Sequence, residues 1–250
     1  MNRDLGIPEQ SRCCLFDLDG VLTQTAVVHA AAWKEMFDDF LREWGQRTSQ
    51  QLAPFDPVAD YDNYVDGKPR ADGTRSFLEA RGIELPEGSP GDEPGKLTIA
   101  GLGNLKNQIV LRRIAEDGVA AYPGSVRYLQ AVEAAGLRRA VVSSSANCKS
   151  VLESAGLGGQ FDAIVDGLVA TREHLAGKPA PDTYLAAARV LGVPAAQAVV
   201  YEDALAGVAS GRAGQFGWVV GVDRVGQADA LRAAGADVVV KDLANLLAER

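Results

Sequence analysis

The sequence predicts an α/β fold in which a parallel β-sheet is flanked by helices and interrupted by one helical insertion. Short apolar runs alternate with longer amphipathic stretches, which is the pattern of strands and helices in a parallel sheet. Glycines follow the helical stretches, as expected where helices end. Between residues 25 and 117, by contrast, no run is typical of a buried strand. The 250 residues suffice for one large domain of this kind with a modest insertion.

The apolar runs predict strands over residues 13–17, 139–143, 163–166, 198–202, 218–222 and 237–240. The amphipathic stretches predict helices over residues 125–135, 148–155, 181–191, 204–213 and 227–234. In the insertion, we expect a helix over 29–44, then an irregular segment, then a further helix from about residue 104. Residues 1–24 and 118–250 are expected to form the core, and residues 25–117 a helical cap. A long loop of the cap, about residues 84–98, has no role that the sequence assigns.

Composition and charge favour a soluble enzyme over a nucleic-acid-binding or membrane protein. The net charge is −8, whereas nucleic acids and anionic membranes favour basic surfaces. A phosphorylated substrate stays possible, because local lysines, amides and a metal can reverse the sign within a pocket. The three cysteines form no regular pattern, and no apolar stretch approaches the roughly 20 residues of a membrane span. We expect a cytoplasmic protein and a monomer, with no nucleic-acid or membrane partner.

The end of the first predicted strand is the most informative segment, because Asp17 and Asp19 lie there just before Gly20. Ligands of open α/β sheets bind at the carboxyl ends of central strands. Two carboxylates in such a place repel each other unless a cation neutralises them, and Mg²⁺ suits these oxygen ligands. One carboxylate can accept a phosphoryl group while the other carries a proton to or from the reacting oxygen. The alternative is structural, with Asp19 in a helix cap or an Asx turn.

Three later segments place polar residues where they could join these aspartates. Ser143 ends the second strand, where hydroxyl and amide groups could bind phosphate; the alternative is an ordinary serine turn. Lys178 lies in a proline-stiffened loop and could hold a charge against a phosphoryl group; the alternative is a solvated lysine. Glu202 and Asp203 end another strand and could complete a metal site; the alternative for Asp203 is a helix cap. We prefer one shared site, because separate structural roles at every segment would be a coincidence.

Together these segments resemble the four signature motifs of the haloacid dehalogenase superfamily. The resemblance implies a Rossmann-like core in which Asp17 is the nucleophile and Asp19 the general acid and base. It implies phosphate binding by the serine loop and the lysine, namely Ser143, Ser144 and Lys178. It also implies Mg²⁺ held by Asp17, Glu202, Asp203 and the backbone carbonyl of Asp19.

The insertion resembles the cap of the β-phosphoglucomutase subfamily. Thr25 and His29 match a hinge that links cap motion to the general acid, although a lone helical histidine is also often a partly buried structural residue. Gly67 and Arg70 match a cap loop that binds the distal phosphate or the sugar. Lys106 resembles a second cap contact with the substrate.

Two departures from the subfamily bear on the substrate. The subfamily often has lysine where this chain has Asp66 and Ala146, and Lys68 could replace the first of these charges. The resemblance implies a Mg²⁺-dependent mutase that interconverts β-D-glucose 1-phosphate and glucose 6-phosphate through an aspartyl phosphate. One alternative is a phosphatase that hydrolyses a small sugar phosphate. The other alternative is a non-catalytic module that kept the fold. A dehalogenase is not expected, because it would need neither Asp19 nor the acidic residues of the metal site.

Overall fold

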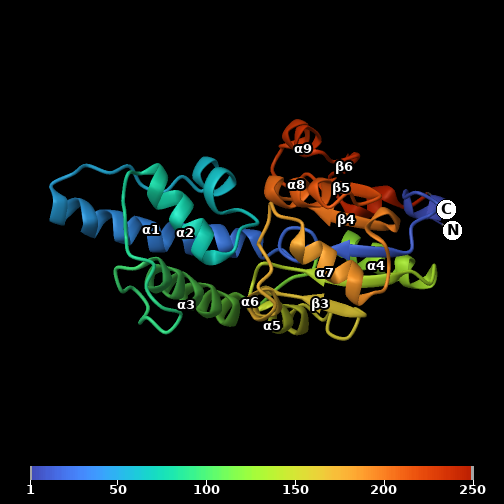
Figure 1. Ribbon diagram of the computed structural model, residues 1–250, viewed down its shortest axis with the longest axis horizontal. Helices are drawn as coiled ribbons and strands as arrows, with labels where there is room; N and C mark the ends of the chain where they lie inside the picture. The colour runs from blue at the N-terminus through green and yellow to red at the C-terminus, as the bar shows by residue number, and fades with distance from the viewer. Residues whose placement is uncertain (1, 249–250) are drawn as a thin grey trace. The chain divides into compact units, whose positions relative to one another are not determined.

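The computed structural model describes residues 2–248, which divide into two compact units (Figure 1). The first, called here the sheet unit, comprises Met1–Gln24 and Val119–Arg250. The second, called the helical unit, comprises Thr25–Gly118.

The sheet unit is built on a parallel sheet of six strands in the order β3-β2-β1-β4-β5-β6. The strands are β1 (Cys13–Phe16), β2 (Arg138–Val142), β3 (Ala163–Val165), β4 (Ala198–Glu202), β5 (Trp218–Val222) and β6 (Val238–Val240). The predicted α/β fold is confirmed, and every predicted strand is present to within one residue at each end. Strand β1 is fully buried because it lies between β2 and β4 and has helices on both faces. The strand order reverses direction between β1 and β4, which is where open α/β sheets bind ligands.

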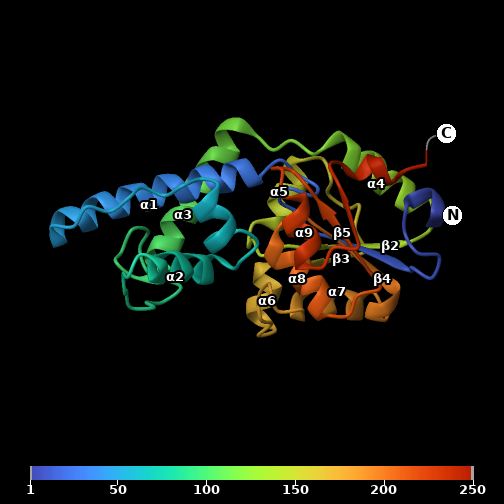
Figure 2. The ribbon, with the colours of Figure 1, turned by 90° about the horizontal axis from the view of Figure 1, so that it is seen from above.

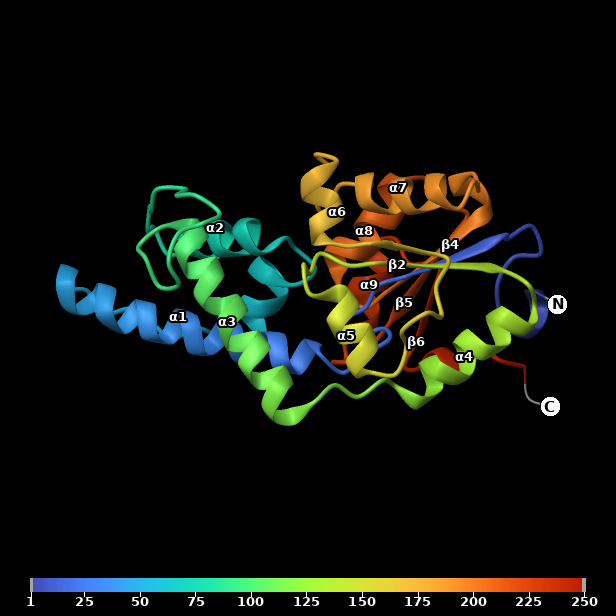
Figure 3. The ribbon, with the colours of Figure 1, turned by 90° about the horizontal axis from the view of Figure 1, so that it is seen from below.

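Helices cover both faces of this sheet. Helices α7 and α8 lie on one face of the sheet, and α4 and α5 lie on the other. Figures 2 and 3, which view the ribbon from opposite sides, both show this arrangement. The helices of the unit are η1 (Asn2–Leu5), α4 (Pro123–Ala134), α5 (Cys148–Ser154), α6 (Gly167–Arg172), α7 (Asp182–Val190), η3 (Ala195–Gln197), α8 (Leu205–Ala213), α9 (Ala228–Ala234) and η4 (Leu243–Leu246). The sequence did not predict α6, because its 6 residues are too few for a periodic pattern.

The helical unit has a separate core. It contains α1 (Ala26–Thr48), the π-helical turn η2 (Tyr61–Val65), α2 (Arg70–Ala80) and α3 (Ile99–Asp117). Aromatic rings fill its centre: Phe37 lies against Trp33, Phe55 and Phe77, with ring centroids 5.2, 5.4 and 4.0 Å apart. From residue 2 to residue 248, no helix combines the length and the apolar character needed to cross a membrane.

Helix α2 corrects the prediction of an irregular segment between the two cap helices. Gly73 and Thr74 lower the helix propensity of this stretch, which hides it from a reading of the sequence. In the structure Gly73 packs so closely that a Cβ there would lie 3.3 Å from the Trp33 ring and from the Val65 Cα. Phe77, on the same helix, is fully buried. Tertiary packing therefore forms this helix where local propensity does not.

A chain of buried hydrogen bonds connects β1 and β4 with α4 and the N-terminal segment. Tyr128 donates its hydroxyl proton to the Leu5 carbonyl at 2.8 Å, so at its other contact it accepts from the Tyr201 hydroxyl, also at 2.8 Å. Cys14 must then donate its S–H to the Tyr201 oxygen, 3.4 Å away. Burial raises the pKa of Cys14 to about 12, which keeps this thiol protonated. One backbone carbonyl thus fixes the direction of the whole chain.

Tyr128→Phe should lower the free energy of unfolding by about 1–3 kcal/mol, because it leaves the Leu5 carbonyl and the Tyr201 hydroxyl buried without their partner. Urea denaturation followed by circular dichroism measures this difference. The matched control is Tyr122→Phe, which keeps the half-buried ring on which Arg224 stacks. The control should change stability by less than about 0.5 kcal/mol. Equal losses in the two variants would contradict the assignment.

Candidate active site

The acidic residues predicted at the ends of β1 and β4 lie together in the structure. Asp17 follows β1 directly, and its backbone N–H donates to the Tyr201 carbonyl of β4 at 2.9 Å. One carboxylate oxygen from each of Asp17, Glu202 and Asp203 lies within 4.8 Å of the others. Asp17 is 7% exposed and Glu202 is fully buried. Adjacent parallel strands therefore deliver three acids to one point at the switch of the sheet.

Lys178 supplies the positive charge of this cluster. Its ammonium group contacts the Asp17 carboxylate, lies 2.6 Å from Glu202 Oε1, and donates to the Val142 carbonyl at 3.4 Å. The residue is only 3% exposed, so it is not the solvated lysine that the sequence left as an alternative. Burial by itself lowers the pKa of the ammonium group, but the adjacent Asp17 and Glu202 carboxylates outweigh it and raise that pKa. Lys178 therefore stays charged.

Glu202 is held rigidly by further contacts. The Tyr184 hydroxyl donates to Oε1 at 2.8 Å, and the Ala204 backbone N–H donates to Oε2 at 3.2 Å. Gly207 packs against the same carboxylate, since a Cβ at that position would lie 1.8 Å from Oε1. Any larger residue at 207 would displace the Glu202 side chain.

Asp203 is half-buried and is fixed from two sides. Gly20, with φ of +85°, lies so close that a Cβ there would be 1.6 Å from Asp203 Oδ2. The Gln227 side chain donates to the Asp203 carbonyl at 3.0 Å. The helix-cap alternative is not realised, because Ala204 is the N-cap residue of α8 and receives no side-chain cap.

The turn that follows Asp17 carries the half-buried Asp19 and is fastened to the sheet unit through its backbone. Inside the turn, the Thr23 hydroxyl and backbone N–H both bind the Leu18 carbonyl, and Gly20 N–H binds the Thr23 carbonyl. From outside, Arg224 donates to the Gly20 carbonyl at 2.7 Å and stacks on the Tyr122 ring. The backbone around Asp19 is thus held from the end of β5.

The serine loop after β2 forms the local turn that the sequence left as an alternative. Ser143 Oγ accepts from the Ser145 backbone N–H at 3.1 Å, which leaves its hydroxyl proton to be donated elsewhere. Ser144 is half-buried in the same loop. Gly167 allows α6 to start against this loop, since a Cβ there would lie 2.7 Å from the Ser144 carbonyl. The turn and a phosphate-binding role are therefore compatible.

The cluster fits a divalent cation by its chemistry and by its charge. It offers hard oxygen donors from three carboxylates, and its one ammonium group contacts two of them, so the cluster holds more acidic than basic groups. Burial raises the pKa of Asp17 well above its usual value; Lys178 opposes the shift, and the nearby Glu202 and Asp19 carboxylates add to it. Such a carboxylate is stabilised when a cation joins it. Among residues 2–248, the Asp19 carboxylate is not part of the cluster, in line with the backbone role that the family resemblance implies.

The predicted cap residues Thr25, His29 and Lys106 lie in the helical unit and contact one another. Thr25 is buried and its carbonyl accepts from the His29 backbone N–H at 2.9 Å, at the start of α1. Lys106 Nζ lies 2.8 Å from His29 Nδ1 and 4.7 Å from the centre of the Trp33 ring. Because an ammonium group only donates, Nδ1 accepts, and the neutral imidazole carries its proton on Nε2. This contact is compatible with both a hinge role and a structural role of His29.

The other two predicted cap residues, Gly67 and Arg70, lie just before and at the start of α2. Gly67 has φ of +68°, a left-handed conformation that favours glycine. Arg70 donates from Nη2 to Asn104 Oδ1 at 3.2 Å, and burial lowers the pKa of its guanidinium group. Lys68, the possible replacement for a missing lysine, points its ammonium group to the Ser76 hydroxyl at 3.0 Å.

Sequence reasoning missed three residues that build this site, namely Tyr184, Arg224 and Gln227. Arg224 lies just beyond β5, so the strand-end rule that found the acids would also have found it. Gln227 contacts Asp203 only because its loop folds back, and Tyr184 lies within a helix pattern that gives no sign of its hydroxyl contact.

Comparison with known proteins confirms the family resemblance. A family model described as haloacid dehalogenase-like hydrolase matches residues 12–215. The chain is 56% identical over 249 residues to a β-phosphoglucomutase of Mycobacterium bovis, covering 98% of this chain and 95% of that protein. It is 30% identical over 239 residues to a β-phosphoglucomutase of Bacillus subtilis, covering 95% of this chain and 92% of that protein.

A solved structure shares the fold. The crystal structure of a β-phosphoglucomutase from Clostridium difficile matches with a TM-score of 0.73 at 24% identity, covering 94% of this chain and 93% of that chain. The chain therefore belongs to the haloacid dehalogenase-like hydrolase family and, within it, to the group of the β-phosphoglucomutases.

Proposed function

We propose that this protein is a Mg²⁺-dependent β-phosphoglucomutase that interconverts β-D-glucose 1-phosphate and glucose 6-phosphate. The main support for phosphoryl transfer is the cluster of acidic residues around Lys178 at one edge of the sheet, formed by Asp17, Glu202 and Asp203. The 56% identity to the mycobacterial enzyme supports the choice of substrate. In this proposal the sheet unit is the catalytic core and the helical unit the cap. A cytoplasmic monomer is part of it; the location is supported by three cysteines that form no regular pattern.

In the first half-reaction Asp17 attacks the phosphorus of one phosphate of a sugar bisphosphate, which leaves as a sugar monophosphate. A bond forms between its carboxylate oxygen and phosphorus, the bond from phosphorus to the sugar oxygen breaks, and Asp19 gives that oxygen a proton. Lys178, Ser143 and Ser144 stabilise the charge on the transferring group. A Mg²⁺ ion held by Asp17, Glu202, Asp203 and the Asp19 carbonyl would supply further charge neutralisation.

In the second half-reaction the phosphoryl group passes from Asp17 to the free hydroxyl of a substrate monophosphate such as β-glucose 1-phosphate. Asp19, now a carboxylate, takes the proton of that hydroxyl as the new bond to phosphorus forms. The product is a sugar bisphosphate, which turns around and returns its other phosphate to Asp17. Arg70 and Lys106 bind the phosphate that is not being transferred, and a hinge at Thr25 and His29 controls the cap.

A second candidate is a phosphatase that acts on a small sugar phosphate with water as the acceptor. Two residues favour it, because Asp66 and Ala146 stand where relatives with the mutase activity often have lysine. Fewer cationic contacts would weaken the hold on a bisphosphate, and a released intermediate ends in hydrolysis rather than isomerisation.

One assay separates these candidates. The protein is supplied with β-glucose 1-phosphate, Mg²⁺ and a trace of β-glucose 1,6-bisphosphate, and glucose 6-phosphate and free phosphate are both measured. Isomerised sugar without free phosphate is the expected result. Release of one phosphate for each sugar consumed would reject the mutase and support the phosphatase.

Asp17→Asn should abolish isomerisation and hydrolysis alike, because the amide cannot form the aspartyl phosphate. The same variant should melt no lower than the wild type, since burial and the Glu202 and Asp19 charges disfavour the ionised carboxylate. Coupled-enzyme assays and thermal melting measure the two effects. Residual turnover well above background would remove Asp17 as the nucleophile.

Mg²⁺ should raise the melting temperature of the wild-type protein, because an ion that binds only the folded state adds about 2.7 kcal/mol at one hundred times its dissociation constant. Asp203→Asn should lose most of that rise, since it removes one carboxylate of the cluster. Differential scanning fluorimetry with and without Mg²⁺ measures it without reference to activity. The control is Asp229→Asn, an exposed acid of α9 outside the cluster, which should keep the Mg²⁺-dependent rise. Loss in both variants would count against the site.

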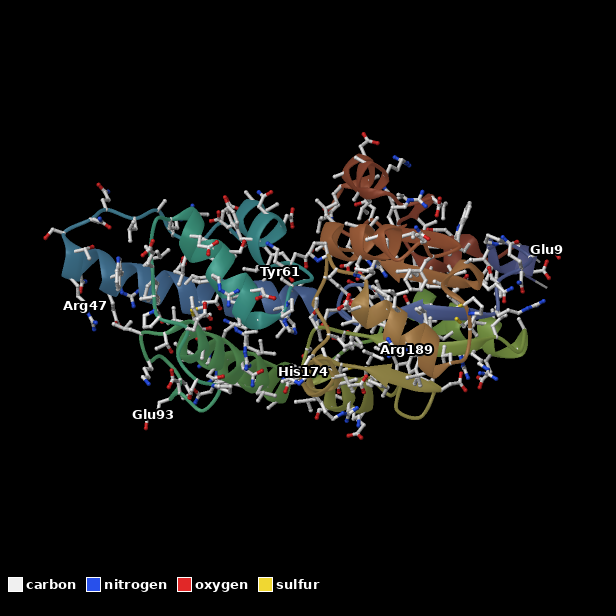
Figure 4. All side chains as sticks on the ribbon, in the orientation of Figure 1. Glu9, Arg47, Tyr61, Glu93, His174 and Arg189 are labelled. Carbon is white, nitrogen blue, oxygen red and sulfur yellow. The ribbon has the colours of Figure 1, made fainter. Side chains whose placement is uncertain are left out.

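His29→Ala should slow isomerisation more than it slows any hydrolysis, because the hinge acts on transfer to the sugar hydroxyl. The ratio of glucose 6-phosphate formed to phosphate released measures this. His174→Ala is the matched control, since His174 is the other histidine of the chain and lies exposed on the surface (Figure 4). An unchanged ratio in His29→Ala would remove the hinge from the proposal.

A further inference from the structure

The long loop of the helical unit folds back on the start of α3 through its backbone. Ile99 N–H donates to the Pro86 carbonyl and Ala100 N–H to the Glu87 carbonyl, both at 3.0 Å. Near the other end of the loop, Gly95 N–H donates to the Gly101 carbonyl at 3.0 Å. Residues 86–98, called here the anchored loop, are therefore fixed to the first turn of α3, beside which they lie in Figure 3.

Asp92 holds the anchored loop together from within. Its carboxylate accepts from the Thr98 hydroxyl at 2.7 Å, from Lys96 Nζ at 2.6 Å and from the Ser89 N–H at 3.2 Å. The side chain is 7% exposed, whereas the neighbouring Glu93 is exposed and points outward (Figure 4). Gly88 has φ of +74°, and a Cβ there would lie 2.2 Å from the same carboxylate. The loop is thus a packed structure with a polar centre.

Asn104, in α3, joins the anchored loop to α2. Its side-chain Nδ2 donates to the Asp92 carbonyl at 2.8 Å and to the Pro90 carbonyl at 3.1 Å. Both amide protons face acceptors of the loop, so the orientation of the amide group is determined. Its Oδ1 then faces Arg70 and accepts from Nη2 at 3.2 Å. With the amide reversed, donors would face donors.

Arg70 is held in place without being neutralised. Its aliphatic stem packs on Gly103, where a Cβ would lie 3.2 Å from Arg70 Cγ. Its hydrogen-bond partner is the neutral Asn104 amide, and the described residues place no carboxylate in an ion pair with it. The guanidinium group has five N–H donors, so one bond to Asn104 leaves others for an anion.

Asn104 lines a groove of about 390 Å³ together with residues of the anchored loop and of α3, among them Pro90, Pro94, Gln108 and Leu111. The Asn104 amide is the side-chain link from the anchored loop to Arg70, since it bonds to both. Removing that amide would take away the hydrogen bond that orients the Arg70 guanidinium group.

We propose that the anchored loop and Asn104 are a positioning device that presents Arg70 to the non-transferred phosphate of the substrate; this rests on the proposed function. Asn104 acts through Arg70 and does not touch the reacting atoms. A guanidinium group fixed before binding loses less conformational freedom when it binds phosphate, so the device increases affinity for substrates that carry a second phosphate.

The test uses full-length protein with two phosphoryl donors. β-Glucose 1,6-bisphosphate always has one phosphate that is not being transferred, whereas p-nitrophenyl phosphate has none. Asn104→Ala should raise KM for the bisphosphate about tenfold and change kcat less than about twofold, because the lost contact serves ground and transition states alike. Asn104→Asp should raise it further, since a carboxylate would neutralise Arg70. With p-nitrophenyl phosphate, kcat/KM should stay within about twofold for both variants.

Two controls separate positioning from damage to the fold. Gln108→Ala, one turn along α3 and lining the same groove, should leave both donors unaffected. Asp92→Asn should raise KM for the bisphosphate, while Glu93→Gln, its exposed neighbour, should not. An unchanged KM in Asn104→Ala, a lower KM in Asn104→Asp, or equal losses with both donors would overturn the inference alone. A wild-type protein that does not use the bisphosphate would overturn the proposed function and the inference together.

Discussion

Two buried carboxylates, those of Asp17 and Glu202, share the Lys178 ammonium group beside Asp203 at the ends of β1 and β4, and this crowding of acids constrains the rest of the sheet unit. Like charges at such distances in a poorly hydrated site repel strongly, and the raised pKa of Asp17 reflects that repulsion together with burial. The arrangement persists because each member is fixed from outside the cluster. Tyr184 and a backbone amide hold Glu202, and Gln227 holds the backbone of Asp203. The surrounding structure therefore offsets the cost of the site, as expected where function opposes stability.

Two glycines come close to the carboxylates of this cluster because they have no Cβ atom. A Cβ at Gly20 or at Gly207 would lie less than 2 Å from an oxygen of Asp203 or Glu202, so neither position tolerates a side chain in this conformation. The turn at Gly20 is also held by hydrogen bonds of its backbone, to Arg224 and Thr23, rather than by side-chain packing. The backbone around Asp19 is thus positioned by contacts from both sides of the turn.

The sequence was sufficient for the strands and for the residues at their ends, because apolar runs followed by polar residues are local signals that few other structures produce. It failed at α2, where tertiary contacts of Gly73 and Phe77 override weak helix propensity. It also failed at Tyr184. The role of this residue depends on which face of its helix contacts Glu202, and the sequence pattern of one helix does not indicate this. The anchored loop had no predictable role for the same reason, since the partner of Asn104 lies 34 residues away in α2. Hydrophobic periodicity indicates which face of a helix or strand is buried, but not which atoms of other elements that face contacts.

The buried Lys178 and the half-buried Arg70 have opposite surroundings, and this affects where an anion can bind. Lys178 is surrounded by more carboxylate charge than it can balance, so without a metal ion it offers little to a phosphate. Arg70 contacts a neutral amide, and burial lowers the pKa of its guanidinium group because no carboxylate offsets the loss of hydration. An anionic ligand beside Arg70 would offset the lost hydration of its guanidinium group. It follows that affinity contributed by Arg70 should be independent of Mg²⁺, whereas affinity contributed by Lys178 should require it.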